Sequence, residues 1–178
     1  GADCVHKFIG MFVFAIVDRK TKKLTIFRDR SGVKPLYYYQ NNGLFCFGSE
    51  LKALIEHPNF KKEISIDGLS LFLKYGYIPS PHSIFQNTYK LDPGHYLTVD
   101  LNTLEILKTS YWNVLDIYNK PKKEIPENEA LNDIEKLIQS ACNYRMVSDV
   151  PVGVFLSGGY DSTIVTTLLQ KSSLTKIK

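Results

Sequence analysis

The order of apolar and polar positions divides the chain into a strand-rich first part and a more helical second part. Residues 8–17 are almost all apolar, which is typical of a strand buried on both faces, and residues 24–28 alternate after a polar turn. These two segments predict a hairpin. Residues 36–39 and 44–48 predict a second hairpin around 40–43, where Asn-Gly supplies the positive φ angles that a tight turn needs.

Two short helices are expected next. Ser49 can cap a helix over residues 50–56, and Asp67 can cap another over residues 68–74 that ends at Gly76. Both predictions depend on a polar residue that precedes a short run of helix-forming residues.

The strand-rich part ends in a polar segment. Strands are last expected over 89–91 and 95–99, on either side of the Asp92-Pro93-Gly94 turn. Residues 119–128 then carry two prolines among lysines and glutamates, which is typical of a linker between domains. We therefore expect three regions, namely a first domain over 1–118, a linker over 119–128 and the start of a second domain over 129–178.

The second part begins with a long amphipathic helix whose apolar residues predict one buried stripe: Ala130, Leu131, Ile134, Leu137, Ile138, Ala141 and Cys142. An apolar run over 152–156 follows and predicts a buried strand, and a second helical segment begins after residue 159. The expected fold class is therefore α+β followed by α/β.

Between that strand and that helix the chain reads Ser157-Gly158-Gly159-Tyr160-Asp161-Ser162. Two successive glycines let the backbone approach an anion closely, and the helix adds its positive N-terminal end. The hydroxyls of Ser157 and Ser162 can donate further hydrogen bonds, whereas Asp161 beside a phosphate requires a cation such as Mg²⁺ between the two negative groups. The loop therefore predicts binding of ATP with a metal. An ordinary flexible turn is the alternative, and the flanking strand and helix patterns favour the nucleotide site.

Composition narrows the class of protein. The 178 residues are 44% hydrophobic and 22% charged, and the net charge of +4 comes from scattered residues rather than a basic stripe, so no nucleic-acid partner is expected. Three distant cysteines show neither a disulfide framework nor a zinc pattern.

No apolar run is long enough for a membrane span and no signal peptide is evident, which predicts a cytoplasmic protein with no membrane partner. The chain starts in mid-pattern without Met, so we expect an internal fragment.

Other charged residues are expected to have structural roles. Arg28, Asp29 and Arg30 form a charge cluster at a strand end, which is usually an ion-paired turn. The four histidines show no metal-ligand spacing, so no metal site other than Asp161 is predicted.

Several segments together resemble glutamine-dependent asparagine synthetase, in which a class II glutamine amidotransferase domain is joined to an ATP-pyrophosphatase synthetase domain. The similar segments occur in the same order as in that family, at residues 10–16, 28–38, 48–54, 77–81, 91–96 and 148–159. The resemblance implies the C-terminal part of an N-terminal-nucleophile amidotransferase β-sandwich, followed by the first helix, strand and loop of an adenine-nucleotide α-hydrolase-like parallel sheet.

The resemblance also implies a reaction. Glutamine is hydrolysed in the first domain, and the ammonia passes to the second, where ATP converts the aspartate side-chain carboxylate into aspartyl-AMP and ammonia then gives asparagine. By position, residues of the loop would hold pyrophosphate, Asp161 would also bind Mg²⁺, and backbone groups near the strand end would face adenine: Phe155, Leu156, Ser157, Gly158, Gly159, Asp161 and Ser162.

No catalytic residue is expected within these 178 residues. The glutaminase reaction of this family uses an N-terminal cysteine, and Cys4 follows Gly-Ala-Asp instead of starting a chain, so the chain alone should be inactive. Three alternatives stay open: a related amidotransferase that acts on a carboxylated sugar of a surface polysaccharide, a ring-closing lactam synthetase, and a noncatalytic nucleotide-binding fragment. The oligomeric state cannot be read from the sequence, and a homodimer is one arrangement left open.

Overall fold

The structure is a computed structural model, and it describes residues 1–173 and 177. The chain divides into two compact units, Gly1–Lys120 and Pro121–Lys178. Each unit is described by itself.

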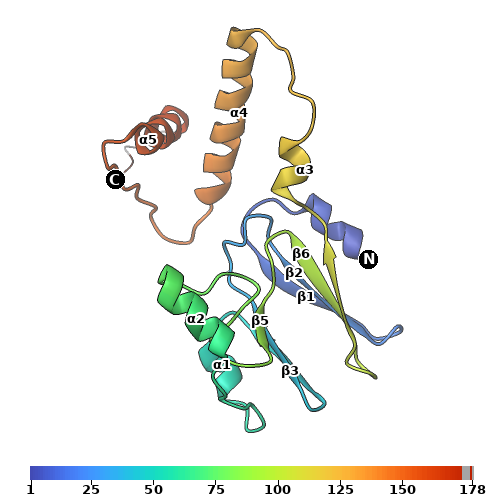
Figure 1. The fold of residues 1–178 in the computed structure, drawn as a ribbon. Coiled ribbons are helices and arrows are strands. Elements are labelled where there is room, and N and C mark those ends of the chain that lie inside the picture. The colour runs from blue at the N-terminus through green and yellow to red at the C-terminus, as the bar shows by residue number, and fades with distance from the viewer. Residues whose placement is uncertain (174–176, 178) are drawn as a thin grey trace. The chain divides into compact units, whose positions relative to one another are not determined.

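The first unit is built on two antiparallel sheets (Figure 1). One sheet has the strand order β1-β2-β6-β7 and the other has the order β4-β3-β5. The strands are β1 (Val13–Asp18), β2 (Lys23–Arg28), β3 (Tyr37–Asn41), β4 (Leu44–Gly48), β5 (Thr88–Lys90), β6 (His95–Asp100) and β7 (Ile106–Ser110). The helices of this unit are η1 (Ala2–Lys7), α1 (Leu51–Ile55), α2 (Ile66–Tyr75) and α3 (Val114–Tyr118).

Both predicted hairpins form. β1 pairs with β2 from Val13 opposite Arg28 to Asp18 opposite Lys23. β3 pairs with β4 around a two-residue turn in which Asn42 and Gly43 have φ angles of 47° and 75°. Positive φ at both central residues is the geometry that Asn-Gly favours, so the local sequence determines this register.

The strands around the Asp92-Pro93-Gly94 turn lie in different sheets. β5 pairs with β3, whereas β6 pairs with β2. The turn therefore carries the chain from one sheet to the other. The larger core cluster lies between these elements and consists of Leu24, Ile26, Leu36, Leu91, Leu97 and Val99.

The prediction of a doubly buried strand over residues 8–17 is wrong in two respects. The strand begins only at Val13, and the side chains of Ile16 and Val17 are 42% and 57% exposed. β1 is an edge strand of its sheet, so its run of apolar residues reflects the β-propensity of these residue types and does not indicate burial on both faces. The helix caps also differ from the prediction, since the N-caps are Glu50 and Ser65 rather than Ser49 and Asp67.

The second unit contains α4 (Glu127–Arg145) and α5 (Tyr160–Ser172). The two helices pack through buried Cys142, Leu168 and Leu169. The predicted buried stripe on α4 is otherwise wrong, because Leu131 and Leu137 are 57% and 71% exposed. None of the described helices is both long and apolar enough to cross a bilayer.

The predicted strand over residues 152–156 does not form. This segment has no assigned secondary structure, and Phe155 is fully exposed. A parallel strand needs hydrogen bonds from neighbouring strands, and no strand among the described residues pairs with it. The structure therefore shows antiparallel sheets followed by helices, and it does not show the parallel sheet expected from the sequence.

Candidate functional site

The predicted phosphate loop lies immediately before α5 and is open to solvent. Gly158 has a φ of 84°, and Gly159 is the N-cap of the helix with extended geometry. A Cβ on Gly158 would meet nothing within 4 Å, so the requirement for glycine there is conformational rather than steric. At Gly159 a Cβ would lie 3.7 Å from the Ser157 hydroxyl, which is ordinary contact. The second glycine is thus not required by the protein's own packing, which fits a position where a ligand approaches.

The serine hydroxyls close the loop on itself. The Oγ atoms of Ser157 and Ser162 are 3.1 Å apart, and Ser162 donates to the carbonyl of Gly159 at 3.1 Å. Thr163 donates to the same carbonyl through its Oγ1 at 2.8 Å. Because these donors already have partners, a phosphate would have to exchange for the contact between the two serines.

The main-chain N–H groups of the loop, in contrast to its hydroxyls, are available to a ligand. No side chain caps the first turn of α5, and no hydrogen bond joins the N–H groups of residues 157–162 to any other described residue. The first N–H groups of a helix lack partners within the helix and carry its positive end. With an exposed loop before it, this helix end fits an anion of the size of a phosphate group.

Asp161 is the acidic residue of the first turn of α5, and its side chain is exposed. Among the described residues, no three His, Cys, Asp or Glu side chains lie close enough together to hold a metal ion. A single carboxylate still fits Mg²⁺, because this ion commonly binds through one or two carboxylates while phosphates and waters complete its shell. The residues present therefore fit Mg²⁺ only together with a bound phosphate.

An apolar hollow of about 430 Å³ lies within the second unit, beside the segment at residues 152–155. Its lining comes from α4, the segment that ends at Phe155, and α5: Ile138, Ala141, Cys142, Val154, Val165 and Leu169. Leu156 is 61% exposed at the next position. The structure thus brings Phe155 to a hollow large enough for an aromatic base, in the same unit as the phosphate loop.

The Arg28–Asp29 cluster is structural, but the ion-paired turn that was predicted is not found among the described residues. Arg28 donates to the carbonyls of Gly32, Lys34 and Leu91, and burial lowers the pKa of its guanidinium from the usual value. Asp29 is 1% exposed and accepts from the main-chain N–H groups of Val33 and Lys34, both at 3.0 Å. Both side chains therefore hold the backbone of one loop in place.

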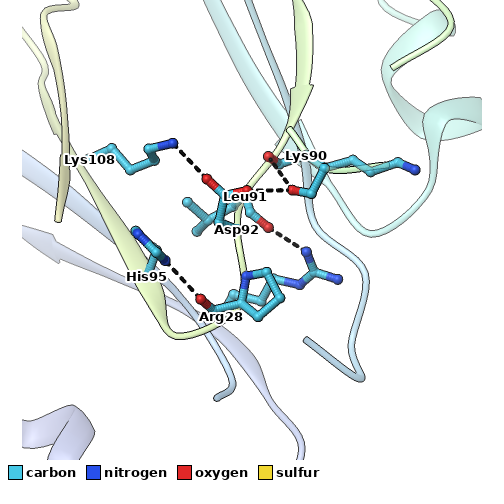
Figure 2. Close-up of polar contacts among 8 residues, drawn as sticks. Arg28, Lys90, Leu91, Asp92, His95 and Lys108 are labelled. Atoms are coloured by element: carbon cyan, nitrogen blue, oxygen red, sulfur yellow. Dashed lines mark hydrogen bonds and ion pairs between the residues drawn. The ribbon is translucent and has the colours of Figure 1, made fainter. Parts of the chain in front are cut away.

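A second polar cluster surrounds Asp92, and no pattern in the sequence predicts it. Figure 2 shows the side chains of Lys108 and Arg28 both directed at the Leu91–Asp92 segment. The Asp92 carboxylate accepts from Lys108 at 2.6 Å and from the Ser80 hydroxyl at 2.6 Å. Burial alone would raise the pKa of Asp92, yet these two donors hold it below its ordinary value. The residues of the cluster are more than ten positions apart, which is why local patterns did not reveal it.

Cys4 lies in η1 and is partly buried. The expectation that it is not catalytic remains a prediction.

Two family descriptions match different parts of the chain. A glutamine amidotransferase domain matches residues 1–112, and an asparagine synthase domain matches residues 133–178.

Individual relatives match almost the whole chain. It is 44% identical over 183 residues to a putative glutamine-hydrolysing asparagine synthetase 2 of Methanocaldococcus jannaschii, covering 99% of this chain and 34% of that protein. It is 38% identical over 167 residues to asparagine synthetase 3 of Bacillus subtilis, covering 93% and 26%. It is also 29% identical over 170 residues to amidase chry2 of Gibberella zeae, covering 95% and 24%. The chain therefore spans between 24% and 34% of the length of these relatives.

Proposed function

We propose that this chain, which belongs to the glutamine amidotransferase family and runs on into the start of an asparagine synthase domain, serves glutamine-dependent asparagine synthesis. The observation that carries the proposal is the join of these two domains in one chain, together with the open phosphate loop in the second. The substrates would be glutamine, aspartate and ATP, which agrees with relatives named as glutamine-hydrolysing asparagine synthetases. The domain division at residues 119–128 and a cytoplasmic location are part of the same proposal.

The chemical problem in this reaction is that a carboxylate is a poor acyl donor, because its leaving group would be an oxide. Reaction with ATP turns that oxygen into part of an AMP ester and releases pyrophosphate, after which ammonia can displace AMP. Holding the two reactants together removes much of the entropic barrier. Within this chain the relevant task is to bind the phosphates in one orientation.

The residues of the loop divide this task. The main-chain N–H groups of Gly158 and Gly159 and the first turn of α5 would bind pyrophosphate oxygens. Ser157 and Ser162, which now contact each other at 3.1 Å, would turn toward the phosphates. Mg²⁺, when bound, would neutralise charge on the departing pyrophosphate, and Asp161 is the residue of this chain that would hold it.

The adenine would lie beside the hollow that Phe155 lines. Backbone groups of Phe155 and Leu156 would face the base, because backbone donors and acceptors at a strand end are positioned to read its edge. This role requires the segment to become a paired strand, as the family resemblance implies. The parallel sheet thus belongs to the proposal and not to the observed structure.

An acceptor other than aspartate is the second candidate. One relative that matches 95% of this chain is named an amidase rather than an asparagine synthetase, so a segment similar to this chain also occurs in a protein with a different name. A carboxylated sugar or a ring-closing reaction therefore stays in the proposal as an alternative acceptor. A noncatalytic nucleotide-binding role is the third candidate.

A chimera tests the proposal. We would replace the aligned segment of the Bacillus subtilis asparagine synthetase 3 with this chain and measure exchange of labelled pyrophosphate into ATP. Exchange that depends on aspartate is expected, and it would show that the loop of this chain serves the activation of a carboxylate by ATP. The choice of acceptor is tested by the same assay on the full-length protein, in which exchange that depends on a uronic acid instead of aspartate would favour the second candidate. Absence of exchange with any carboxylate, in a chimera that still folds, would favour the noncatalytic reading.

Variants of the chimera test the residue roles. Asp161→Ala is expected to lower exchange by at least a hundredfold, because the metal loses its protein ligand (on the order of 3 kcal/mol of transition-state stabilisation). Asp133→Ala is the matched control, since Asp133 is an exposed carboxylate on α4. Equal exchange in the two variants would remove the assignment of Asp161.

A further inference from the structure

The tip of the β3–β4 hairpin combines an asparagine and a glycine in an unusually accessible arrangement. Asn42 and Gly43 are both exposed, and both have positive φ angles. A Cβ on Gly43 would meet nothing within 4 Å, so nothing crowds its main-chain nitrogen from that side. The side-chain amide of Asn42 makes no hydrogen bond with a described residue, whereas the nearby Gln40 amide donates to the carbonyl of Leu104 at 2.6 Å.

This arrangement suits a reaction between neighbouring residues. The main-chain nitrogen of Gly43 can lose its proton to a solvent base and attack the side-chain carbonyl carbon of Asn42. A new nitrogen–carbon bond forms, the bond to the amide nitrogen breaks, and ammonia leaves. Water then opens the resulting cyclic imide at either carbonyl, which gives aspartate or isoaspartate at position 42. Glycine favours this attack because it has no side chain beside the nucleophilic nitrogen.

Water reaches the site freely. An open hollow of about 540 Å³ is lined by the hairpin tip and by the loop at residues 57–61. Lys61 and His57 line the same hollow, so a new carboxylate at position 42 would gain basic neighbours. Both the hydrolysis step and the charged product are therefore compatible with the surroundings.

We propose that Asn42 is the site in this chain at which spontaneous deamidation occurs first, and that its isoaspartyl product opens the β3–β4 hairpin. The isoaspartyl linkage routes the main chain through a side-chain methylene and so lengthens a two-residue turn. The pairing of Asn41 with Leu44 depends on the length and type of that turn. Opening the hairpin would loosen the small core of Tyr39, Leu54 and Phe60, against which Leu44 packs.

The chain contains two internal comparisons. Asn87 also has a positive φ, of 56°, but the residue after it is Thr88, which is buried and β-branched. Asp67 precedes a glycine, but the N–H of Gly68 donates to the Ser65 hydroxyl at 3.1 Å and Gly68 is buried. At each of these positions the attack is obstructed in a way that does not apply at position 42.

Incubation of the folded chain at mildly alkaline pH, followed by peptide mapping with mass spectrometry, tests the first half of the proposal. The peptide that contains position 42 is expected to change from amide to acid several-fold faster than the peptide that contains Asn87, with isoaspartate as a product. The Asn42→Gly variant, which keeps the positive φ, should show no such change. Modification at Asn87 before position 42, or modification at position 42 only after unfolding, would overturn the proposal.

A stability measurement tests the second half. The isoaspartyl form should unfold at a lower urea concentration than the unmodified chain, whereas Asn42→Asp should unfold close to the unmodified chain, because it adds the charge without lengthening the backbone. Equal midpoints for the isoaspartyl and unmodified forms would show that the hairpin does not open.

Discussion

Replacement of Asp29 by asparagine measures how strongly burial amplifies a pair of carboxylate–amide hydrogen bonds. Asp29 is 1% exposed and accepts from two main-chain N–H groups at 3.0 Å. Asparagine keeps one acceptor oxygen and turns an NH₂ group toward the other N–H, so one charge-assisted bond is lost and one donor is left without a partner. Since hydrogen bonds to charged groups contribute about 1.5–3 kcal/mol each, we expect the free energy of unfolding to fall by about 2–3 kcal/mol.

Asp18 provides the matched control. Its carboxylate also accepts from two main-chain N–H groups, those of Lys20 and Thr21, and these bonds lower the pKa of Asp18. Asp18 differs from Asp29 because it is exposed. Water can replace its bonds, so Asp18→Asn should cost much less than Asp29→Asn.

Urea denaturation with tryptophan fluorescence gives the readout. Trp112 is the one tryptophan of the sequence and lies in the same unit. The main-chain N–H of Trp112 donates to the carbonyl of Gly94, and the main-chain N–H of Gly94 donates to the carbonyl of Asp29. The fluorescence of Trp112 therefore reports on the region around Asp29. Equal losses of unfolding free energy for Asp29→Asn and Asp18→Asn would refute the argument from burial.

Three further predictions follow from the same unit. The pKa of Asp92 lies below its ordinary value, so the stability contributed by its contact with Lys108 is present above the unfolded pKa and is lost as pH falls through the folded pKa. Lys108→Met should therefore flatten the acid limb of a curve of unfolding free energy against pH. Gly94→Ala should destabilise the chain strongly, because the new Cβ would lie 2.2 Å from the Trp112 carbonyl oxygen. Gly76→Ala should cost only the strain of its positive φ, because a Cβ there would meet nothing within 4 Å. Thermal melts of both variants check this difference. Burial raises the pKa of Tyr38 to about 12, so Tyr38→Phe should remove absorbance change only at the alkaline end of an ultraviolet titration.

Features fixed by neighbouring residues could be predicted from the sequence. The β3–β4 turn follows from Asn42-Gly43, and the end of α2 follows from Gly76, whose φ of 75° is the left-handed geometry expected of a helix C-cap. Helix α5 follows from the pattern after Gly159. In each case the determinant lies within a few residues of the feature.

Features that depend on distant partners could not be predicted. An apolar run such as residues 152–156 reads the same whether or not a neighbouring strand is present, and here none pairs with it among the described residues. The bond from Arg28 to the carbonyl of Leu91 joins residues 63 positions apart, so its local sequence suggested only an ion-paired turn.

The sequence predicts which residues form the candidate site, and the structure shows which contacts those residues make. The sequence indicated which hydroxyls and amides could face a phosphate. It could not show that Ser157 and Ser162 contact each other, or that the main-chain donors of the loop are open. These details depend on the path of the backbone at Gly158, which the sequence permits but does not determine.

Binding of phosphates by the main chain of the loop at residues 157–162 can be followed in an amide titration. The ¹⁵N-labelled chain would be titrated with magnesium pyrophosphate while the main-chain resonances are followed. Saturable shifts are expected at Gly158, Gly159 and Asp161, with the N–H groups of the Asn42-Gly43 turn unchanged. Shifts spread evenly over exposed amides, or no shift in the loop, would contradict it.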